Sequence, residues 1–311
     1  MIEEGNHSFT PLGLPDDTSL PFFAYGIFKK GEIAWPRLQD SVSDSKQCRL
    51  IGHALKIRNG LAVAVVGKDL GIMGTAHFPL GENLYSIVGE SEPKSQYKWQ
   101  EAQIPEIGKA NFLLGRYPDR DTSLEYSADW SSINDPAFRF GLPFVRHGIE
   151  TAISEMTAIE VVGDDPNQWS AYFSMQSVYL LMWTIFERYL RFAYGEHDSI
   201  RSRYKKLETS TAFRRSMEQI EITDLIVYDS RSPQRRPNST LNSGRSSEWM
   251  TEVLHSWYSI RSNIAHRGKD TFEKQKLPPV ARELLGVLQL FLPRVIHGLD
   301  EQWNLDTAQI T

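Results

Sequence analysis

The sequence has little cysteine and no long apolar run. Cys48 is the single cysteine in 311 residues, which excludes an internal disulfide framework and a zinc site built from cysteines. The longest apolar run, residues 178–185, is far shorter than the roughly 20 residues of a membrane-spanning helix. The first four residues, Met-Ile-Glu-Glu, are followed by no apolar h-region, so we expect no signal peptide. These absences favour a cytoplasmic protein with no membrane partner.

The composition that is present is that of a globular protein. Hydrophobic residues make up 41% of the chain and charged residues 23%, which excludes fibrous and wholly disordered classes. A length of 311 residues allows two domains. The net charge of −5 is unevenly distributed, because residues 1–164 carry −7 and residues 165–311 carry +2. This asymmetry favours two units with different partners.

Short apolar runs separated by glycines fill residues 20–117, after a polar and flexible lead-in over residues 1–19. The runs lie at 22–28, 50–57, 61–66, 72–78 and 111–114. Arg58-Asn59-Gly60 separates two of them, and Asn-Gly is typical of a hairpin turn because both residues tolerate positive φ. No long helical period interrupts these runs. We therefore expect a small β-barrel or sheet with little helix.

The hydrophobic period becomes helical in the second half of the chain. Residues 118–167 are expected to be a connecting segment with one helix, at 147–161. Residues 168–300 predict an all-α bundle of about four helices, and residues 301–311 a tail. The expected helices lie at 171–194, 199–221, 248–266 and 279–299, and a Ser/Arg/Pro-rich loop lies at 228–247. The predicted fold class is thus α+β with two domains.

Arg261 and His266 lie at the end of the helix expected at 248–266. Five residues of an ideal helix rotate a side chain by roughly 140°, so these two share a site only if the last turn relaxes or a second chain contributes. Ser262 and His266, four residues apart, share a face. A histidine in a last helical turn is also favoured by the helix dipole, and it needs no further function there.

This R-x4-H pattern resembles that of the HEPN superfamily over about residues 168–300. The resemblance rests on Arg261 to His266, on Trp257-Tyr258 before them, on Arg267-Gly268 after them, and on an earlier apolar helix ending in Glu187. It implies a metal-independent ribonuclease in which the R-x4-H helices of a homodimer form one cleft. Bacterial antiviral and toxin effectors are commonly built this way. Many HEPN-like domains, however, only dimerise or bind a ligand.

The resemblance also implies a role for each residue of the motif. His266 would act as general acid/base and Arg261 would stabilise the phosphate, which suits a titrating imidazole and an always-charged guanidinium. Asn263 or Ser262 would position the phosphate or the imidazole ring. Glu187 would orient Arg261 or His266, or would only form a salt bridge with an arginine. The products would be a 2′,3′-cyclic phosphate and a 5′-OH, with no cofactor and no metal.

Basic residues are concentrated in residues 201–245, where ten basic residues stand against five acidic ones. An arginine-rich loop beside a cleft can neutralise RNA phosphates, although a solvated basic face is an equal alternative. The arginines expected to contact RNA are Arg231, Arg235, Arg236, Arg245 and Arg267.

Tyr25-Gly26-Ile27-Phe28 ends an apolar run at a glycine, which lets a ligand approach backbone N–H groups. Together with Ile51-Gly52-His53-Ala54-Leu55 and the strand around Gly74, it resembles the γ-glutamylcyclotransferase/AIG2-like fold over residues 20–117. In that family the first strand ends in Y-G-(S/T)-L, whose loop holds the carboxylate of the substrate. A glutamate then acts as acid/base on the α-amine.

The N-terminal region departs from that family at several positions. Glu90 and Glu92 are both candidates for the acid, and both are also compatible with surface carboxylates in a polar turn. Ile27 and Phe28 are bulkier than the family's residues, which favours a module that binds a small-molecule or protein regulator. Two alternatives stay open: a working cyclotransferase dimerised by the helical domain, and a non-catalytic dimer that binds RNA or a ligand.

Overall fold

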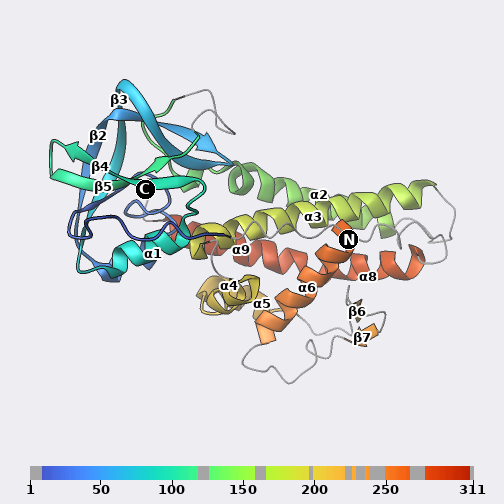
Figure 1. Ribbon diagram of the computed structural model, residues 1–311. Helices are drawn as coiled ribbons and strands as arrows, with labels where there is room; N and C mark the ends of the chain where they lie inside the picture. The colour runs from blue at the N-terminus through green and yellow to red at the C-terminus, as the bar shows by residue number, and fades with distance from the viewer. Residues whose placement is uncertain are drawn as a thin grey trace. The chain divides into compact units, whose positions relative to one another are not determined.

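The computed structural model describes residues 9–117, 126–157, 166–195, 199–220, 226–228, 235–237, 249–266 and 277–308. The chain forms two compact units. The first unit consists of Met1–Pro136, Arg191–Ser199 and Leu305–Thr311, and the second of Ala137–Leu190 and Ile200–Asn304. Strands dominate the first unit and helices the second, so the α+β class with two parts is confirmed (Figure 1).

Five strands form a barrel in the first unit, in the order β2-β3-β1-β5-β4. Their bounds are β1 Phe22–Ala24, β2 Val42–Arg58, β3 Leu61–Pro79, β4 Tyr97–Ile104 and β5 Gly108–Gly115. The second half of β3 is antiparallel to β1, which is itself parallel to β5. The first half of β3 reaches β5 directly, where Ala64 pairs with Leu114 in parallel and closes the barrel.

The β2–β3 hairpin turns where the sequence predicts it. Asn59 and Gly60 adopt φ values of 50° and 79°, as a tight hairpin turn requires, so this prediction is confirmed. The apolar runs expected on either side lie within two long strands rather than several short ones. One glycine between the runs, Gly52 with φ 79°, forms a bulge in β2 instead of ending the strand.

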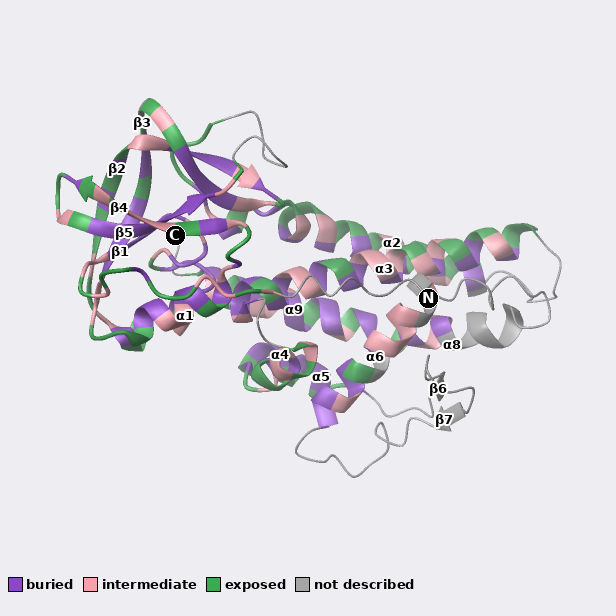
Figure 2. Cartoon of the chain, in the orientation of Figure 1, coloured by how far each residue is buried: buried purple, intermediate pink, exposed green. Residues whose placement is uncertain are grey.

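The barrel interior is apolar, and one short helix covers part of it (Figure 2). The fully buried side chains include Phe23, Leu50, Leu55, Val63, Ile72 and Phe112. Helix α1, Asn83–Ser91, buries Leu84, Tyr85 and Val88. Residues 83–91 thus form a short helix in a unit for which the sequence predicts little helix, since their apolar positions follow a helical period.

The described helices of the second unit are joined by aromatic side chains. Their bounds are α2 Leu142–Thr157, α3 Pro166–Tyr194, α4 Ile200–Leu207, α5 Thr211–Glu218, α6 Trp249–His266, α8 Leu277–Leu290 and α9 Leu292–Thr307. Phe186 of α3 stacks on Tyr204 of α4 and on Phe213 of α5. Helices α2 and α3 lie side by side, with Gly148 against Val178 (Figure 1).

Several predictions for this part of the chain are wrong in detail. The expected tail at 301–311 is helical up to Thr307, as the end of α9. The helix expected at 199–221 is divided into α4 and α5, and the helix expected at 279–299 is divided into α8 and α9. Pro293 explains the second break, because proline has no N–H to donate to the preceding turn and favours the first turn of a helix. The expected loop at 228–247 includes part of a two-stranded sheet, β6 Ile226–Tyr228 with β7 Arg235–Pro237.

The expected connecting segment, residues 118–167, is divided between the two units. The first unit extends to Pro136, and α2 belongs to the second. Contacts attach each part of the segment to its own unit. In the first unit, Trp130 donates a hydrogen bond to the Gly60 carbonyl. In the second unit, Phe138 stacks on Trp303 with ring centroids 3.7 Å apart. None of the described helices combines the length and apolar content that crossing a bilayer requires.

Candidate functional site

Helix α6 ends at His266, as the sequence predicts, and carries the R-x4-H motif in its last turns. Arg261 and Ser262 are half-buried. The side chains of Asn263 and His266 lie outside the described residues, so the structure places only their backbone. The apolar stripe of α6 is buried at Trp249, Leu254 and Trp257, and is half-buried at Ile260 and Ile264.

A chain of contacts connects Arg261 to Glu187 on the facing helix α3. The Arg261 guanidinium carbon lies 5.8 Å from the centre of the Tyr258 ring, within reach of a cation–π interaction. The ring centroids of Tyr258 and Trp183 lie 6.0 Å apart. The Trp183 indole N–H donates a 2.8 Å hydrogen bond to Glu187 Oε1. These two rings connect Glu187 to Arg261 within the described residues.

Two further tyrosines make this region a buried polar cluster. The Tyr179 hydroxyl donates a 2.8 Å hydrogen bond to the carbonyl of Trp257, which ties α3 to α6. The buried Tyr204 hydroxyl has no hydrogen-bond partner among the described residues. Burial raises the pKa of Tyr204 well above its usual range, and the nearby Glu187 carboxylate raises it further. The tyrosine therefore remains a neutral phenol beside a carboxylate.

Most of the expected RNA contacts cannot be placed. Arg235 and Arg236 lie on β7, paired in register with Tyr228 and Val227 of β6, and only their backbone is described. Arg231, Arg245 and Arg267 lie outside the described residues.

The barrel brings together five of the six residues proposed as its ligand-binding set. Tyr25, Gly26, Ile27, Phe28 and Glu92 line one cavity, together with Ala62 and Tyr97. Glu90 is exposed on α1. The end of the helix separates the two glutamates. Glu90 lies on α1, which ends at Ser91, whereas Glu92 follows it with extended backbone, φ −109° and ψ 131°, and lines the cavity.

The cavity beside Tyr25 is small. Its volume is about 30 Å³, enough for one or two waters but too little for a γ-glutamyl compound unless the walls move. The Tyr25 hydroxyl donates a 2.6 Å hydrogen bond to the Leu113 carbonyl, so its proton is not available to a ligand. Burial raises the pKa of Tyr25 above its usual range, and Glu92 raises it further.

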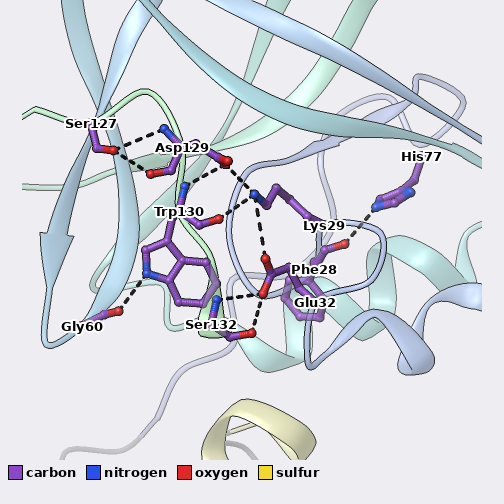
Figure 3. A network of polar contacts seen from close by, with 9 residues as sticks. All are labelled: Phe28, Lys29, Glu32, Gly60, His77, Ser127, Asp129, Trp130 and Ser132. Carbon is purple, nitrogen blue, oxygen red and sulfur yellow. Dashed lines mark hydrogen bonds and ion pairs between the residues drawn. The ribbon is translucent and has the colours of Figure 1, made fainter. Parts of the chain in front are cut away.

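A network of polar contacts anchors the loop of residues 29–32, which directly follows Phe28 of the cavity wall (Figure 3). Lys29 Nζ lies 2.5 Å from both Asp129 Oδ1 and the Trp130 carbonyl, and 3.9 Å from Glu32 Oε1. Glu32, only 2% exposed, accepts hydrogen bonds from the backbone N–H and the hydroxyl of Ser132. The loop is therefore fixed to residues 129–132 rather than left to move.

His77 holds the same loop from the other side. Its Nε2 is 2.9 Å from the Phe28 carbonyl (Figure 3). Its Nδ1 is 2.8 Å from the Ser45 hydroxyl, and Trp35 stacks on its ring. Burial lowers the pKa of His77 to about 4, although the hydrogen bond to Phe28 raises it in part. The ring is therefore neutral near pH 7, donating through Nε2 and accepting through Nδ1, which is a structural role.

Sequence reasoning missed the residues that connect distant segments. Trp183 and Glu187 are four residues apart on a helix, so their hydrogen bond could have been predicted from spacing. The approach of Tyr204 and Tyr258 to that pair depends on how α3, α4 and α6 come together, and no local pattern encodes it. The described residues contain no group of three or more His, Cys, Asp or Glu side chains placed to hold a metal ion.

Comparison of the chain with protein-family models, with curated proteins and with solved structures finds no match in any of the three.

Proposed function

We propose that the protein is a metal-independent endoribonuclease that acts as a homodimer in the cytoplasm. One observation supports it most: Glu187, Trp183 and Tyr258 form a contact chain that leads to Arg261 in the last turns of α6. A half-buried guanidinium held against an aromatic ring is pre-organised to receive a phosphate. The HEPN resemblance adds the general acid/base, His266, five residues further on.

The chemistry uses the nucleophile that RNA carries itself. The ribose 2′-OH attacks the adjacent phosphorus while a base removes its proton, and the P–O bond to the 5′-oxygen breaks as that oxygen receives a proton. His266 is assigned these proton transfers and Arg261 the charge that develops on the non-bridging oxygens. The products are a 2′,3′-cyclic phosphate and a 5′-OH. On the same resemblance, the barrel unit is proposed to sense or regulate in a defence or toxin effector.

The helical geometry of the motif supports the homodimer that the HEPN resemblance implies. Arg261 and His266 diverge by roughly 140° on one helix, so one cleft receives both groups more readily from two copies of α6. The half-buried Ile260 and Ile264 provide apolar surface at the same end of the helix.

We expect light scattering of the purified full chain to give twice the 35.6 kDa chain mass. We also expect RNA cleavage per chain to rise with protein concentration until the dimer is saturated. A monomer that cleaves RNA at a rate strictly proportional to its concentration would contradict the shared cleft.

A second candidate function is supported by the barrel cavity, where Glu92 lies with the Tyr25-Gly26 turn. In a cyclotransferase the α-amine of a γ-glutamyl amine attacks its own γ-carbonyl. The C–N bond to the amine leaving group breaks, a glutamate carries the proton to that group, and 5-oxoproline is released. The cavity volume of about 30 Å³ weighs against this function, so RNA cleavage remains the favoured one.

The cyclotransferase alternative predicts that Glu92→Gln abolishes release of 5-oxoproline from γ-glutamyl amines. Glu90→Gln is the matched control, since Glu90 is exposed and does not line the cavity. Chromatography of the products measures both. If the wild-type chain releases no 5-oxoproline, or if the two variants release it equally, this alternative is excluded.

A further inference from the structure

A second and much larger pocket opens on the barrel unit, at the place where β3 and β5 close the sheet. Its volume is about 430 Å³, within the range of small-molecule sites. We call it the tyrosine pocket, and the side chains that give it its chemistry are Lys56, Lys98, Arg116, Tyr117, Tyr126 and Val66. None of them belongs to the R-x4-H helix or to the cavity beside Tyr25.

The barrel closure itself creates this pocket. Strands β3 and β5 pair only at Ala64 and Leu114, and the residues that follow on both strands line the opening. Gly115 is required there, because a Cβ atom would lie 2.2 Å from the Val63 side chain. The pocket is thus a consequence of how two parallel segments meet and then separate.

The described lining of the tyrosine pocket is cationic, whereas the half of the chain that contains it is acidic overall. Three of its nine described lining residues are cationic, and none of the nine is a carboxylate. The half of the chain that contains it carries a net charge of −7. Lys56, only 7% exposed, lies 5.4 Å above the centre of the Tyr126 ring. This local reversal of charge is suited to an anionic ligand.

The two tyrosine rings of the pocket are exposed while their backbones are held in place. Tyr117 is 65% exposed and Tyr126 is 55% exposed. Arg58 Nη2 donates to the carbonyls of Arg116 and Tyr117, at 2.6 Å and 3.3 Å. Ser127, next to Tyr126, exchanges two backbone hydrogen bonds with Leu55 of β2. Large exposed rings on a fixed frame are what base stacking uses.

Tyr117 also occupies an unfavourable backbone region. Its φ is 53°, which is uncommon for any residue other than glycine, asparagine or aspartate. Such strain persists when surrounding contacts enforce it, as the hydrogen bond from Arg58 to the Tyr117 carbonyl does here. Backbone strain of this kind is concentrated at active sites and ligand sites.

We propose that the tyrosine pocket binds a nucleoside phosphate. The base stacks on the exposed tyrosine rings, and the phosphates pair with Lys98 and Arg116. Stacking distinguishes this ligand from inorganic anions, and the cations distinguish it from a neutral aromatic compound. Residues 118–125, between the two tyrosines, lie outside the described residues. The proposal goes beyond RNA cleavage and does not rest on it, because binding is measurable whether or not RNA is cut.

Calorimetric titration of the full chain with the four ribonucleoside triphosphates tests the proposal. We expect saturable binding of at least one of them, at least tenfold tighter than binding of sodium triphosphate, because only the nucleotides carry a base that stacks on the tyrosine rings. A short single-stranded RNA without terminal phosphates serves as the third probe. Equal affinity for sodium triphosphate, binding of the RNA alone, or no binding at all would overturn the proposal.

Variants locate the binding within the barrel. Lys98→Glu is expected to weaken nucleotide binding at least tenfold. Tyr117→Gly is expected to weaken it about tenfold without loss of thermal stability, because glycine tolerates positive φ. Lys109→Glu, the same charge change at the opposite end of β5, is the control that should bind normally. Unchanged affinity in the first two variants, with their fold confirmed by circular dichroism, would place the ligand elsewhere and refute the pocket.

Discussion

His266→Ala is expected to lower the rate of RNA cleavage about a thousandfold. A positioned general acid/base contributes on the order of 10²–10⁴ in rate, and His266 is the residue to which the proposal assigns both proton transfers. Arg261→Ala is expected to lower the rate at least a hundredfold, because the transition-state charge then loses its guanidinium. Initial rates on single-stranded RNA with excess EDTA measure both effects.

His297→Ala is the matched control for this series. His297 is exposed on α9 and belongs to no proposed site, so its loss should leave the rate within a factor of two. Equal cleavage by the wild type and all three variants would show that a contaminant or another site cuts the RNA. Arg261→Lys adds a finer test, since a lysine keeps the charge but cannot hold a phosphate with two parallel hydrogen bonds.

Glu32→Ala is expected to lower the free energy of unfolding of the barrel by about 3 kcal/mol. Removing one partner of a buried pair leaves the other without compensation, which costs about 3–5 kcal/mol when both groups are buried. Here Lys29 keeps Asp129, but the Ser132 backbone N–H and hydroxyl lose their acceptor. Urea unfolding followed by tryptophan fluorescence measures the loss, because Trp130 belongs to the same network.

The exposed Glu82 supplies the control for that measurement. Glu82→Ala changes the same type of side chain at the start of α1, with no side-chain hydrogen bond there to lose. Its effect should stay below about 0.5 kcal/mol, as for most surface substitutions. A loss below 1 kcal/mol in Glu32→Ala would mean that the network in Figure 3 does not hold the loop in solution.

Local patterns allowed much of the fold to be predicted. The Asn59-Gly60 turn depends on two neighbouring residues, and the helical end at His266 depends on one apolar period. The closure of the barrel at Ala64 and Leu114 joins strands 50 residues apart in sequence, which no local pattern encodes. The breaks at Ser210 and Phe291 interrupt periods that the sequence continues, so they were predicted as single helices.

The candidate sites, like the fold, were predicted only where a local sequence pattern encodes them. The sequence identified the Tyr25-Gly26 turn, but only the end of α1 selects Glu92 over Glu90. It identified Glu187 and Arg261, but Trp183 and Tyr258 connect them only once α3 and α6 are packed. The tyrosine pocket draws Lys56, Lys98 and Arg116 from separate strands and the residue after β5, with no motif in common.

The ends of the RNA fragments test the central claim most directly. The full chain is incubated in EDTA with an RNA and with the same RNA carrying 2′-deoxyribose at the cleaved position, and the products are analysed by mass spectrometry. Attack by the 2′-OH predicts a 2′,3′-cyclic phosphate, a 5′-OH and no cleavage of the deoxy substrate. Fragments with a 5′-phosphate and a 3′-OH, cleavage of the deoxy substrate, or cleavage abolished by EDTA would contradict the account.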